Sequence, residues 1–421
     1  MAERGRMPAG VRALVAEVMR REEYEGPHEV AEEFEEAAGA EVYGRLGGLV
    51  GMPADGLVLV ADADAAFAVL VGRLGLGRGD RVWTTPFESV GRLSVLTAAC
   101  ARSRARLETV PLRADGDLDL EWMAARLDED VALVSVTHVP MGCGIVQPVE
   151  AVGRLLAGHR CLYAVDGAQS VGQLPVDGRA MGCDVLTGDG WRFLRGPLGV
   201  GFAALSPRAR ALLATPAPAS AMGGWAASTG VSGGVGSAGV LGPEPQLAAV
   251  VGLNAALTDQ AGIGAVDGAG LWPLLRAAVG QVPGVELIAP GRVQCGIVTF
   301  HHPRLPAALI RRELAARGVA VWKTVAQQMP LYLPQRGVTT AVRASVDADH
   351  TPHDLARLTQ ALEDVIRTAT PRTAAPARTS ALAAAAPAMA GPAGAANDLP
   401  TATRPAAGRR HLTLLPSLTP A

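Results

Sequence analysis

The amino-acid sequence predicts an α/β protein with a large, mainly parallel sheet domain and a smaller α+β domain nearer the C-terminus. Short apolar segments of strand length alternate with segments of helical period between residues 57 and 205. A segment rich in Gly, Ala, Ser and Pro follows at 215–245, and shorter elements in a different order begin near residue 271. Strands that alternate with helices at this spacing are typical of parallel βαβ units, so the first region is expected to form the parallel sheet.

The elements of the large domain follow from these periods. Apolar residues at helical spacing predict helices over 11–21 and 29–49, the second with acidic residues in its first turns. Runs of apolar residues predict strands at 57–60, 81–84, 107–111, 131–136, 161–165, 185–187 and 200–205. Helices are expected between them at 65–74, 93–101, 120–127 and 149–157. The segment 215–245 is expected to form a long loop over the surface or the mouth of an active site.

A further helix of the large domain is expected at 246–260, and the pattern changes from about residue 271. From there, helices are expected at 271–279, 305–317 and 352–367, and strands at 285–289, 296–301, 319–322 and 340–344. After residue 369 the chain consists mainly of Ala, Pro and Thr, which cannot bury enough apolar surface to order itself. The expected organisation is an N-terminal helix (1–22), a large domain (23–265), a small domain (266–368) and a disordered tail (369–421).

Bulk composition excludes several classes of protein. A formal net charge of −2 over 421 residues gives no reason to expect a nucleic-acid partner. The sequence lacks an apolar run of the ~20 residues that span a bilayer, and its first residues lack a signal peptide, so a cytoplasmic protein with no membrane partner is expected. The five cysteines form no CxxC pair, which argues against a disulfide framework or a zinc site, and no metal is expected.

Two adjacent segments carry a specific pattern. Residues 164–177 read AVDGAQSVGQLPVD, and residues 183–197 read CDVLTGDGWRFLRGP. Together they resemble the cofactor-binding core of class V aminotransferases, which are fold-type-I pyridoxal-phosphate (PLP) proteins that include cysteine desulfurases and isopenicillin-N-epimerase-like enzymes. The resemblance runs from about Tyr24 to Ile366. It implies a seven-stranded, mainly parallel sheet, a small C-terminal domain, and an active site between the two at a dimer interface.

Arg192 occupies the position at which the resemblance implies the lysine that forms a Schiff base with PLP. A Schiff base requires a neutral amine, whereas a guanidinium stays protonated in proteins. Lys323 is the only lysine of the chain. It is expected to be a solvated loop residue, with a relocated Schiff base as the alternative.

Three further residues have roles that the resemblance implies. Asp166 would pair with the pyridine nitrogen of PLP, and Gln169 would hydrogen-bond the ring hydroxyl; the alternative is an inherited polar pair that caps the following turn. His138 ends a predicted strand and is either structural or catalytic. Cys143 follows it in a loop and is expected to be a small buried filler rather than a nucleophile.

The residues at the expected phosphate site differ from those that the resemblance implies. The resemblance implies hydroxyl and amide donors in two turns, where this chain has Asp64 and Asp189. Asp62 and Asp64 are also expected to cap the N-terminus of a helix. A carboxylate within about 4 Å of a phosphate charge costs about 4 kcal/mol at an effective dielectric constant near 20. PLP is therefore expected to be bound without a covalent bond, or not at all.

Arg343 lies in the segment VRASV, which resembles the strand whose arginine binds the α-carboxylate of the substrate. The expected ligand is therefore a small carboxylated molecule that resembles an amino acid, and the alternative for Arg343 is a structural ion pair. Acidic residues of the region, including Asp347, together with His138 offer a weaker alternative, a site for a metal or a cationic ligand.

Three functions are compatible with these residues. The first is an enzyme of specialised metabolism, natural-product or sulfur and amino-acid metabolism, with altered chemistry. The second is a non-catalytic partner or scaffold of an intact homologue. The third is a PLP-dependent lyase, epimerase or desulfurase-like enzyme that binds its cofactor atypically. A homodimer, or a heterodimer with a homologue, is expected in each case.

Overall fold

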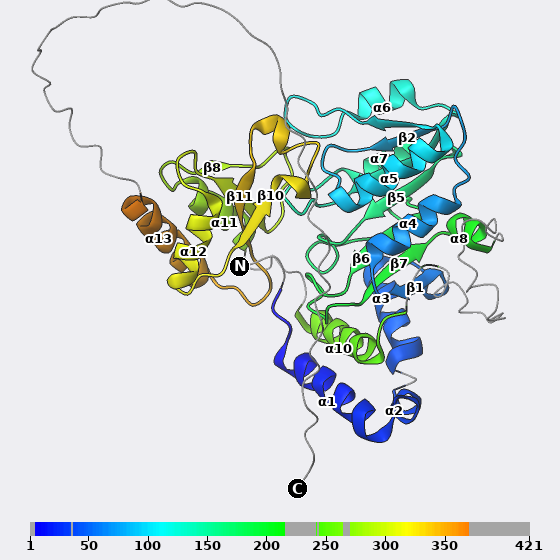
Figure 1. Ribbon diagram of the computed structural model, residues 1–421, viewed down its shortest axis with the longest axis horizontal. Helices are drawn as coiled ribbons and strands as arrows, with labels where there is room; N and C mark the ends of the chain where they lie inside the picture. Colours follow the sequence, from blue (N-terminus) through cyan, green and yellow to red (C-terminus); the bar gives the residue numbers. More distant parts are fainter. Residues whose placement is uncertain (1–4, 35–36, 215–240, 242–243, 264–269, 370–421) are drawn as a thin grey trace, which may run out of the picture. The chain divides into compact units, whose positions relative to one another are not determined.

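A computed structural model describes residues 5–34, 37–214, 241, 244–263 and 270–369. The described residues belong to one compact unit that two β-sheets organise (Figure 1). Most of the expected loop at 215–245 lies outside the described residues. So does the expected disordered tail, apart from Ala369, which ends the last helix.

The larger sheet has seven strands in the order β1-β7-β6-β5-β4-β2-β3. Strand β7 is antiparallel to both of its neighbours, and the other pairings are parallel. The prediction of a seven-stranded, mainly parallel sheet is confirmed. All seven strands lie within two residues of their predicted positions: β1 Leu57–Val60, β2 Arg81–Thr84, β3 Arg106–Thr109, β4 Val131–Thr137, β5 Leu162–Asp166, β6 Val185–Asp189 and β7 Gly201–Leu205.

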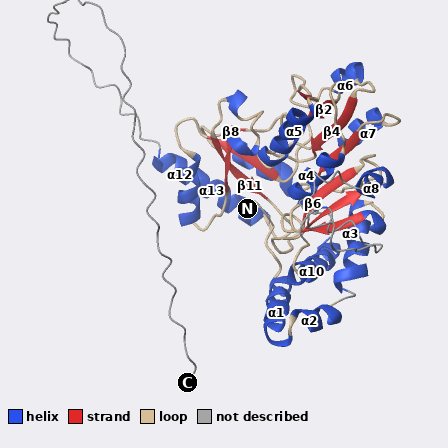
Figure 2. Ribbon diagram, turned by 45° about the vertical axis from the view of Figure 1, so that its right-hand side comes forward, coloured by secondary structure: helices blue, strands red, loops and turns tan. Residues whose placement is uncertain are grey.

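Helices cover both faces of this sheet. Along β1 the side chains alternate: Val58 and Val60 pack with α4, α5 and α8, whereas Leu57 and Leu59 pack in the core shared with α3, α6, α7 and α10. Figure 2 shows the strands between α4 and α5 on one side and α7 on the other. These helices are α3 Val42–Val50, α4 Ala63–Arg73, α5 Val90–Ser103, α6 Leu120–Arg126, α7 Val149–Leu156, α8 Pro207–Ala214 and α10 Leu247–Ile263; the sequence did not predict α8.

The N-terminal helices pack on α10 through apolar side chains. Helix α1 (Ala9–Glu25) and helix α2 (Pro27–Glu33) bury Val18 and Val30 against it. The prediction of one helix over 29–49 is wrong. Helix α2 ends at Glu33, and a π-helical turn at Ala37–Glu41 contains Gly39 at φ −100° and ψ −111°, a non-helical conformation that separates α2 from α3.

The smaller sheet is antiparallel, with strands in the order β10-β11-β9-β8. Val342 and Ala344 of β11 pack into the core with the helices, and Arg343 and Ser345 therefore lie on the opposite face. The elements are α11 Leu271–Gly280, β8 Glu286–Leu287, β9 Ile297–His301, α12 Ala307–Ala316, β10 Trp322–Val325, β11 Thr340–Ser345 and α13 Pro352–Ala369. Among the described helices, none is both long and apolar enough to span a bilayer.

One strand of the smaller sheet is shifted from its predicted position at 319–322. Gly318 adopts φ +73° after α12, and the Val319 amide donates to the carbonyl of Leu314 at 2.9 Å. This bond closes the end of the helix with a left-handed glycine, so the residues after it still belong to the helix cap. The strand begins only at Trp322.

Gly172 fixes the position of the loop after β5 against the segment that contains Arg192. It has φ +86°, and a Cβ there would lie 2.6 Å from the carbonyl carbon of Phe193 and 2.8 Å from the amide of Leu194. We expect Gly172→Ala to destabilise the protein by about 2–4 kcal/mol, from left-handed strain plus the clash. Gly199→Ala is the matched control, since Gly199 has φ +89° but no atom within 4 Å of the added Cβ. Equal losses for the two variants in urea unfolding would contradict this assignment.

Candidate functional site

The candidate site lies where the parallel strands of the larger sheet end. Asp166 is the last residue of β5, Asp189 is the last residue of β6, and His138 directly follows β4. Asp64 lies in the first turn of α4, which Asp62 caps by accepting hydrogen bonds from the amides of Asp64 and Ala65. The expected helix cap is confirmed for Asp62 but not for Asp64, which lies inside the helix and accepts a hydrogen bond from Arg92 instead. Ligands commonly bind at such strand ends in open α/β sheets.

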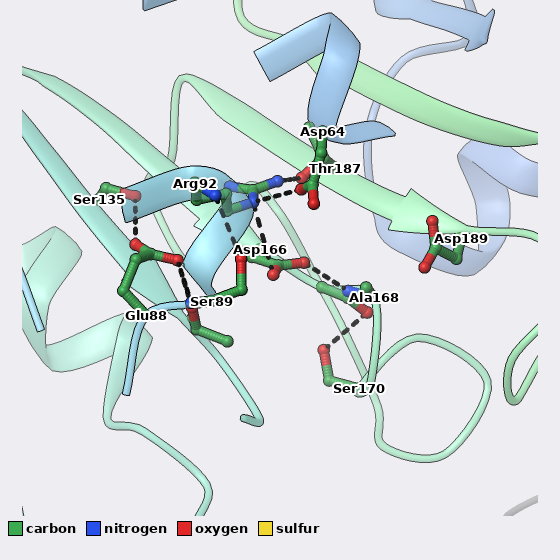
Figure 3. Close-up of polar contacts among 12 residues, drawn as sticks. Asp64, Glu88, Ser89, Arg92, Ser135, Asp166, Ala168, Ser170, Thr187 and Asp189 are labelled. Carbon is green, nitrogen blue, oxygen red and sulfur yellow. Dashed lines mark hydrogen bonds and ion pairs between the residues drawn. The ribbon is translucent and has the colours of Figure 1, made fainter. Parts of the chain in front are cut away.

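The centre of the site is Arg92, a residue that the sequence analysis did not identify. It lies in the first turn of α5 and is 1% exposed. Its Nε donates to Oδ1 of Asp64 at 3.0 Å and lies 3.5 Å from Oδ2 of Asp166, and its Nη2 donates to the hydroxyl of Thr187 (Figure 3). The guanidinium carbon lies 4.2 Å from the ring centroid of Phe67. Two carboxylates, a hydroxyl and an aromatic ring thus surround one buried cation.

A second unpredicted group, Glu88, lies beside Arg92 with its carboxylate fully buried. It accepts hydrogen bonds from the hydroxyls of Thr84 (3.2 Å) and Thr137 (2.9 Å). It also accepts from the hydroxyl of Ser135 at 2.9 Å (Figure 3). Burial raises the pKa of Glu88, and the charge of Arg92 acts in the opposite direction. The hydroxyls hold this carboxyl group in place at the base of the site.

Arg192 forms an ion pair with Asp189, three residues before it. Its Nε donates to Oδ2 of Asp189 at 2.7 Å, and its guanidinium carbon lies 4.2 Å from the ring centroid of Trp191. Arg192 is 7% exposed. Burial raises the pKa of Asp189, and the charge and hydrogen bond of Arg192 oppose this rise. The acid expected to repel a phosphate is therefore the partner of the arginine at the lysine position.

Asp166 and His138 are joined through the main chain. The carbonyl of Asp166 accepts from the His138 amide at 3.0 Å, and Oδ1 of Asp166 accepts from the Ala168 amide at 2.9 Å. The second bond is the turn cap that was the alternative role for Asp166. Burial lowers the pKa of His138 to about 4, so its imidazole is neutral near pH 7.

Arg343 and Gln169 contact each other directly. Nη2 of Arg343 donates to Oε1 of Gln169 at 2.9 Å, Nη1 donates to the carbonyl of Met141 at 2.9 Å, and Nε donates to Ser345 at 3.0 Å. Arg343 is fully buried. Nε2 of Gln169 is also buried and makes no hydrogen bond within the described part of the chain. The two residues are brought together, and each makes contacts within this chain.

The remaining candidates are Cys143, Lys323 and Asp347. Burial raises the pKa of Cys143 to about 12, so the thiol is protonated and packs as an apolar side chain against Met329, as expected for a filler. The expectation that Lys323 is a solvated loop residue is wrong: it lies in strand β10, opposite Val342, and is only partly exposed. Asp347 binds His350 at 2.6 Å. Within the described ranges, no cluster of three or more His, Cys, Asp or Glu side chains is arranged to hold a metal ion.

Comparisons with known proteins agree with this architecture. The family model for aminotransferase class-V matches residues 51–358. A cysteine desulfurase from Escherichia coli O8 is 29% identical over 306 residues, which cover 70% of this chain and 73% of the relative. A cysteine desulfurase from Salmonella typhimurium is 29% identical over 300 residues, which cover 69% and 72%.

Solved structures show the same fold at low sequence identity. A cysteine desulfurase from Thermococcus onnurineus has a TM-score of 0.72 at 19% identity, covering 87% of this chain and all of that one. A cysteine desulfurase from Escherichia coli has a TM-score of 0.73 at 19% identity, covering 86% and 92%. A third structure, with a TM-score of 0.71 at 18% identity over 86% and 94%, has glycine covalently linked to its PLP cofactor. The architecture is thus that of fold-type-I PLP proteins.

Proposed function

The chain belongs to the aminotransferase class-V family, and from this premise we propose that it is a member without Schiff-base chemistry, which acts through binding. One observation carries the proposal: the side chain at the lysine position is Arg192, whose guanidinium is engaged by Asp189 at 2.7 Å. An amine that attacks an aldehyde must be able to lose its proton, and a guanidinium paired with a carboxylate keeps it. The fold alone does not require catalysis.

PLP is the cofactor expected for the family, and when bound it supplies an electron sink for amino-acid chemistry. The residues of this chain do not fit a covalently held PLP. Arg192 offers no amine, Asp166 is already paired with Arg92, and Asp189 brings a carboxylate to the expected phosphate turn. We therefore derive no reaction step through PLP.

The role that these residues support best is that of a non-catalytic member that pairs with an intact, lysine-bearing homologue. Asp166, Asp189 and Arg343 are engaged by other side chains of the chain, while the two-sheet architecture is retained. Retention of the fold without the reactive groups favours a structural or regulatory role in a homodimer or a heterodimer. Co-expression of the chain with such a homologue tests the idea: a stable mixed dimer that alters the activity of the homologue supports it.

A second candidate is the binding of a small carboxylated ligand that resembles an amino acid. The buried pair of Arg343 and Gln169 favours it, because Nε2 of Gln169 makes no hydrogen bond within the described part of the chain. A carboxylate could take the place of the Gln169 oxygen on the guanidinium and accept from the freed amide. Thermal-shift measurements with amino acids test this candidate, with Arg343→Lys as the variant expected to abolish the shift.

The loss of Schiff-base chemistry predicts a simple spectroscopic result. On addition of PLP, the purified protein is expected to show no protein-bound imine absorbance near the visible edge, because Arg192 stays protonated and Lys323 lies in β10. The measurement is an absorbance titration followed by borohydride reduction and mass spectrometry of the tryptic peptides. A reduced adduct on Lys323 that forms stoichiometrically would show that the Schiff base has moved there.

A further inference from the structure

Arg92 lies against the carboxylate of Asp166, with its Nε 3.5 Å from Oδ2. The guanidinium is planar and lies 4.2 Å from the ring centroid of Phe67, and two carboxylates approach its Nε. An aromatic face with carboxylates at the edge is an environment suited to a flat cation. The pocket that surrounds this guanidinium therefore has the chemistry of a cation-binding subsite.

We propose that Asp64 and Asp166 form a subsite for a planar cation, and that Arg92 is its built-in occupant, which closes the subsite to a protonated pyridine ring. This proposal rests on the proposed function, because a protein that holds no covalent cofactor does not require space for a pyridine ring beside Asp166. The occupant Arg92 would also exclude PLP that binds without a covalent bond, which the loss of the lysine alone does not explain.

Burial supports the assignment of Arg92 as occupant rather than as a surface ion pair. The side chain is 1% exposed, Asp166 is 13% exposed, and Thr187 is fully buried. A buried arginine is stable only when its charge is matched, and the charge of this one is matched by the carboxylates of Asp64 and Asp166. Its Nε and Nη2 donate to Asp64 and Thr187, while its Nη1 makes no hydrogen bond within the described residues. Figure 3 shows the guanidinium between Asp64, Asp166 and Thr187, so a ring cation at Asp166 would have to displace it.

The subsite is open to solvent on one side. The side chain of Asp64 is 52% exposed, although its Oδ1 is bonded to the buried Arg92. A small cation can therefore reach the carboxylates once the arginine side chain is shortened. The place that Arg92 leaves has an aromatic face at Phe67 and a hydroxyl acceptor at Thr187.

Pyridoxamine is the probe that isolates this subsite. It has a pyridine ring that can be protonated, but it has no aldehyde to form a Schiff base and no phosphate for Asp189 to repel. Its binding therefore reports on the subsite formed by Asp64 and Asp166, without a contribution from a Schiff base or a phosphate. If the pyridoxamine test fails, the absorbance test of the proposed function still stands. The absorbance test asks whether an amine of the protein forms an imine with the aldehyde of PLP, and it does not depend on Arg92.

The experiment compares wild-type protein, Arg92→Ala, and Arg92→Ala combined with Asp166→Asn by pyridoxamine fluorescence and thermal shift. We expect no saturable binding to the wild type, binding to Arg92→Ala with a Kd of about 1 mM or tighter, and at least about tenfold weaker binding to the double variant. Methylguanidinium should raise the melting temperature of Arg92→Ala and leave that of the wild type unchanged.

Two results would overturn the proposal. One is saturable binding of pyridoxamine to the wild type, and the other is a folded Arg92→Ala variant that binds neither cation. Should Arg92→Ala not fold, the wild type alone still decides the matter by NMR of ¹⁵N-labelled arginine. The Arg92 Nε–H is expected to exchange slowly and to be insensitive to pyridoxamine, and a resonance displaced by pyridoxamine would contradict the assignment.

Discussion

Replacement of Arg192 by lysine alone is expected to give a protein that stays colourless when PLP is added. The substitution supplies the missing amine, but it also removes the partner of Asp189, which is 18% exposed. The new lysine would then form an ion pair with Asp189 and keep its proton. The carboxylate of Asp64 and the Arg92 guanidinium at Asp166 would also remain.

The size of the effect follows from the charges. A carboxylate about 4 Å from a phosphate charge costs about 4 kcal/mol at an effective dielectric constant near 20, and Asp64 contributes less because it is half exposed. Together, Asp64 and Asp189 are expected to weaken PLP binding by about 4–8 kcal/mol. This corresponds to a roughly 10³–10⁶-fold lower affinity for PLP, which would abolish micromolar binding. The amine alone cannot offset this repulsion.

A combined variant tests whether Asp64, Asp189 and Arg92 are the residues that prevent PLP from binding. Arg192→Lys together with Asp64→Ser, Asp189→Thr and Arg92→Asn restores an amine, provides hydroxyl donors for a phosphate, and frees Asp166 for a protonated ring nitrogen. We expect only this variant to become yellow and to keep the cofactor through gel filtration. The triple variant that retains Arg92 is the matched control. A yellow, stable holoprotein from Arg192→Lys alone would show that the acidic turns matter little.

The fold could be predicted because the apolar patterns of the sequence agree with the positions of the strands in the sheet. The strands at 57–60 and 81–84 occur where the sequence placed them, since short apolar runs between helices have few other solutions in an α/β domain. Two of the errors fall at glycines. Gly39 breaks a helix that the apolar period would continue, and Gly318 extends a helix cap into a segment with strand-like composition. Periodicity alone does not report the backbone angle of a single residue.

The site could be predicted only where a motif marked it. Asp166, Gln169, Arg192 and Arg343 were identified as candidates through the resemblance, but Arg92, the ion-pair partner of Asp166, was not, because the two residues lie far apart in the sequence. Arg92 did leave a signal. It shares the buried face of α5 with Leu96, Ala99 and Cys100, at spacings of four, seven and eight residues, where a charge is unexpected unless it is paired.

Acidification is expected to destabilise the protein through His138, with the largest change between pH 6.5 and 4. The imidazole is 5% exposed, and burial lowers its pKa from 6.5 to about 4 in the folded state. Between these values the unfolded chain binds a proton that the folded chain does not, so stability rises with pH across this window. Each pKa unit corresponds to about 1.4 kcal/mol, which gives about 3 kcal/mol lost on going from pH 7 to pH 4.

Glu88 changes the stability with pH in the opposite direction to His138, so the two contributions must be measured separately. Burial raises its pKa in the folded state, so the folded chain binds the extra proton, and its contribution to stability falls as pH rises above about 4.5. His138→Asn removes the histidine titration and keeps that of Glu88. The free energy of unfolding in urea at several pH values therefore gives the histidine contribution as the difference in slope between wild type and variant. Parallel pH profiles would mean that His138 has the same pKa in the folded and unfolded states, and the neutral, buried imidazole assigned here would be wrong.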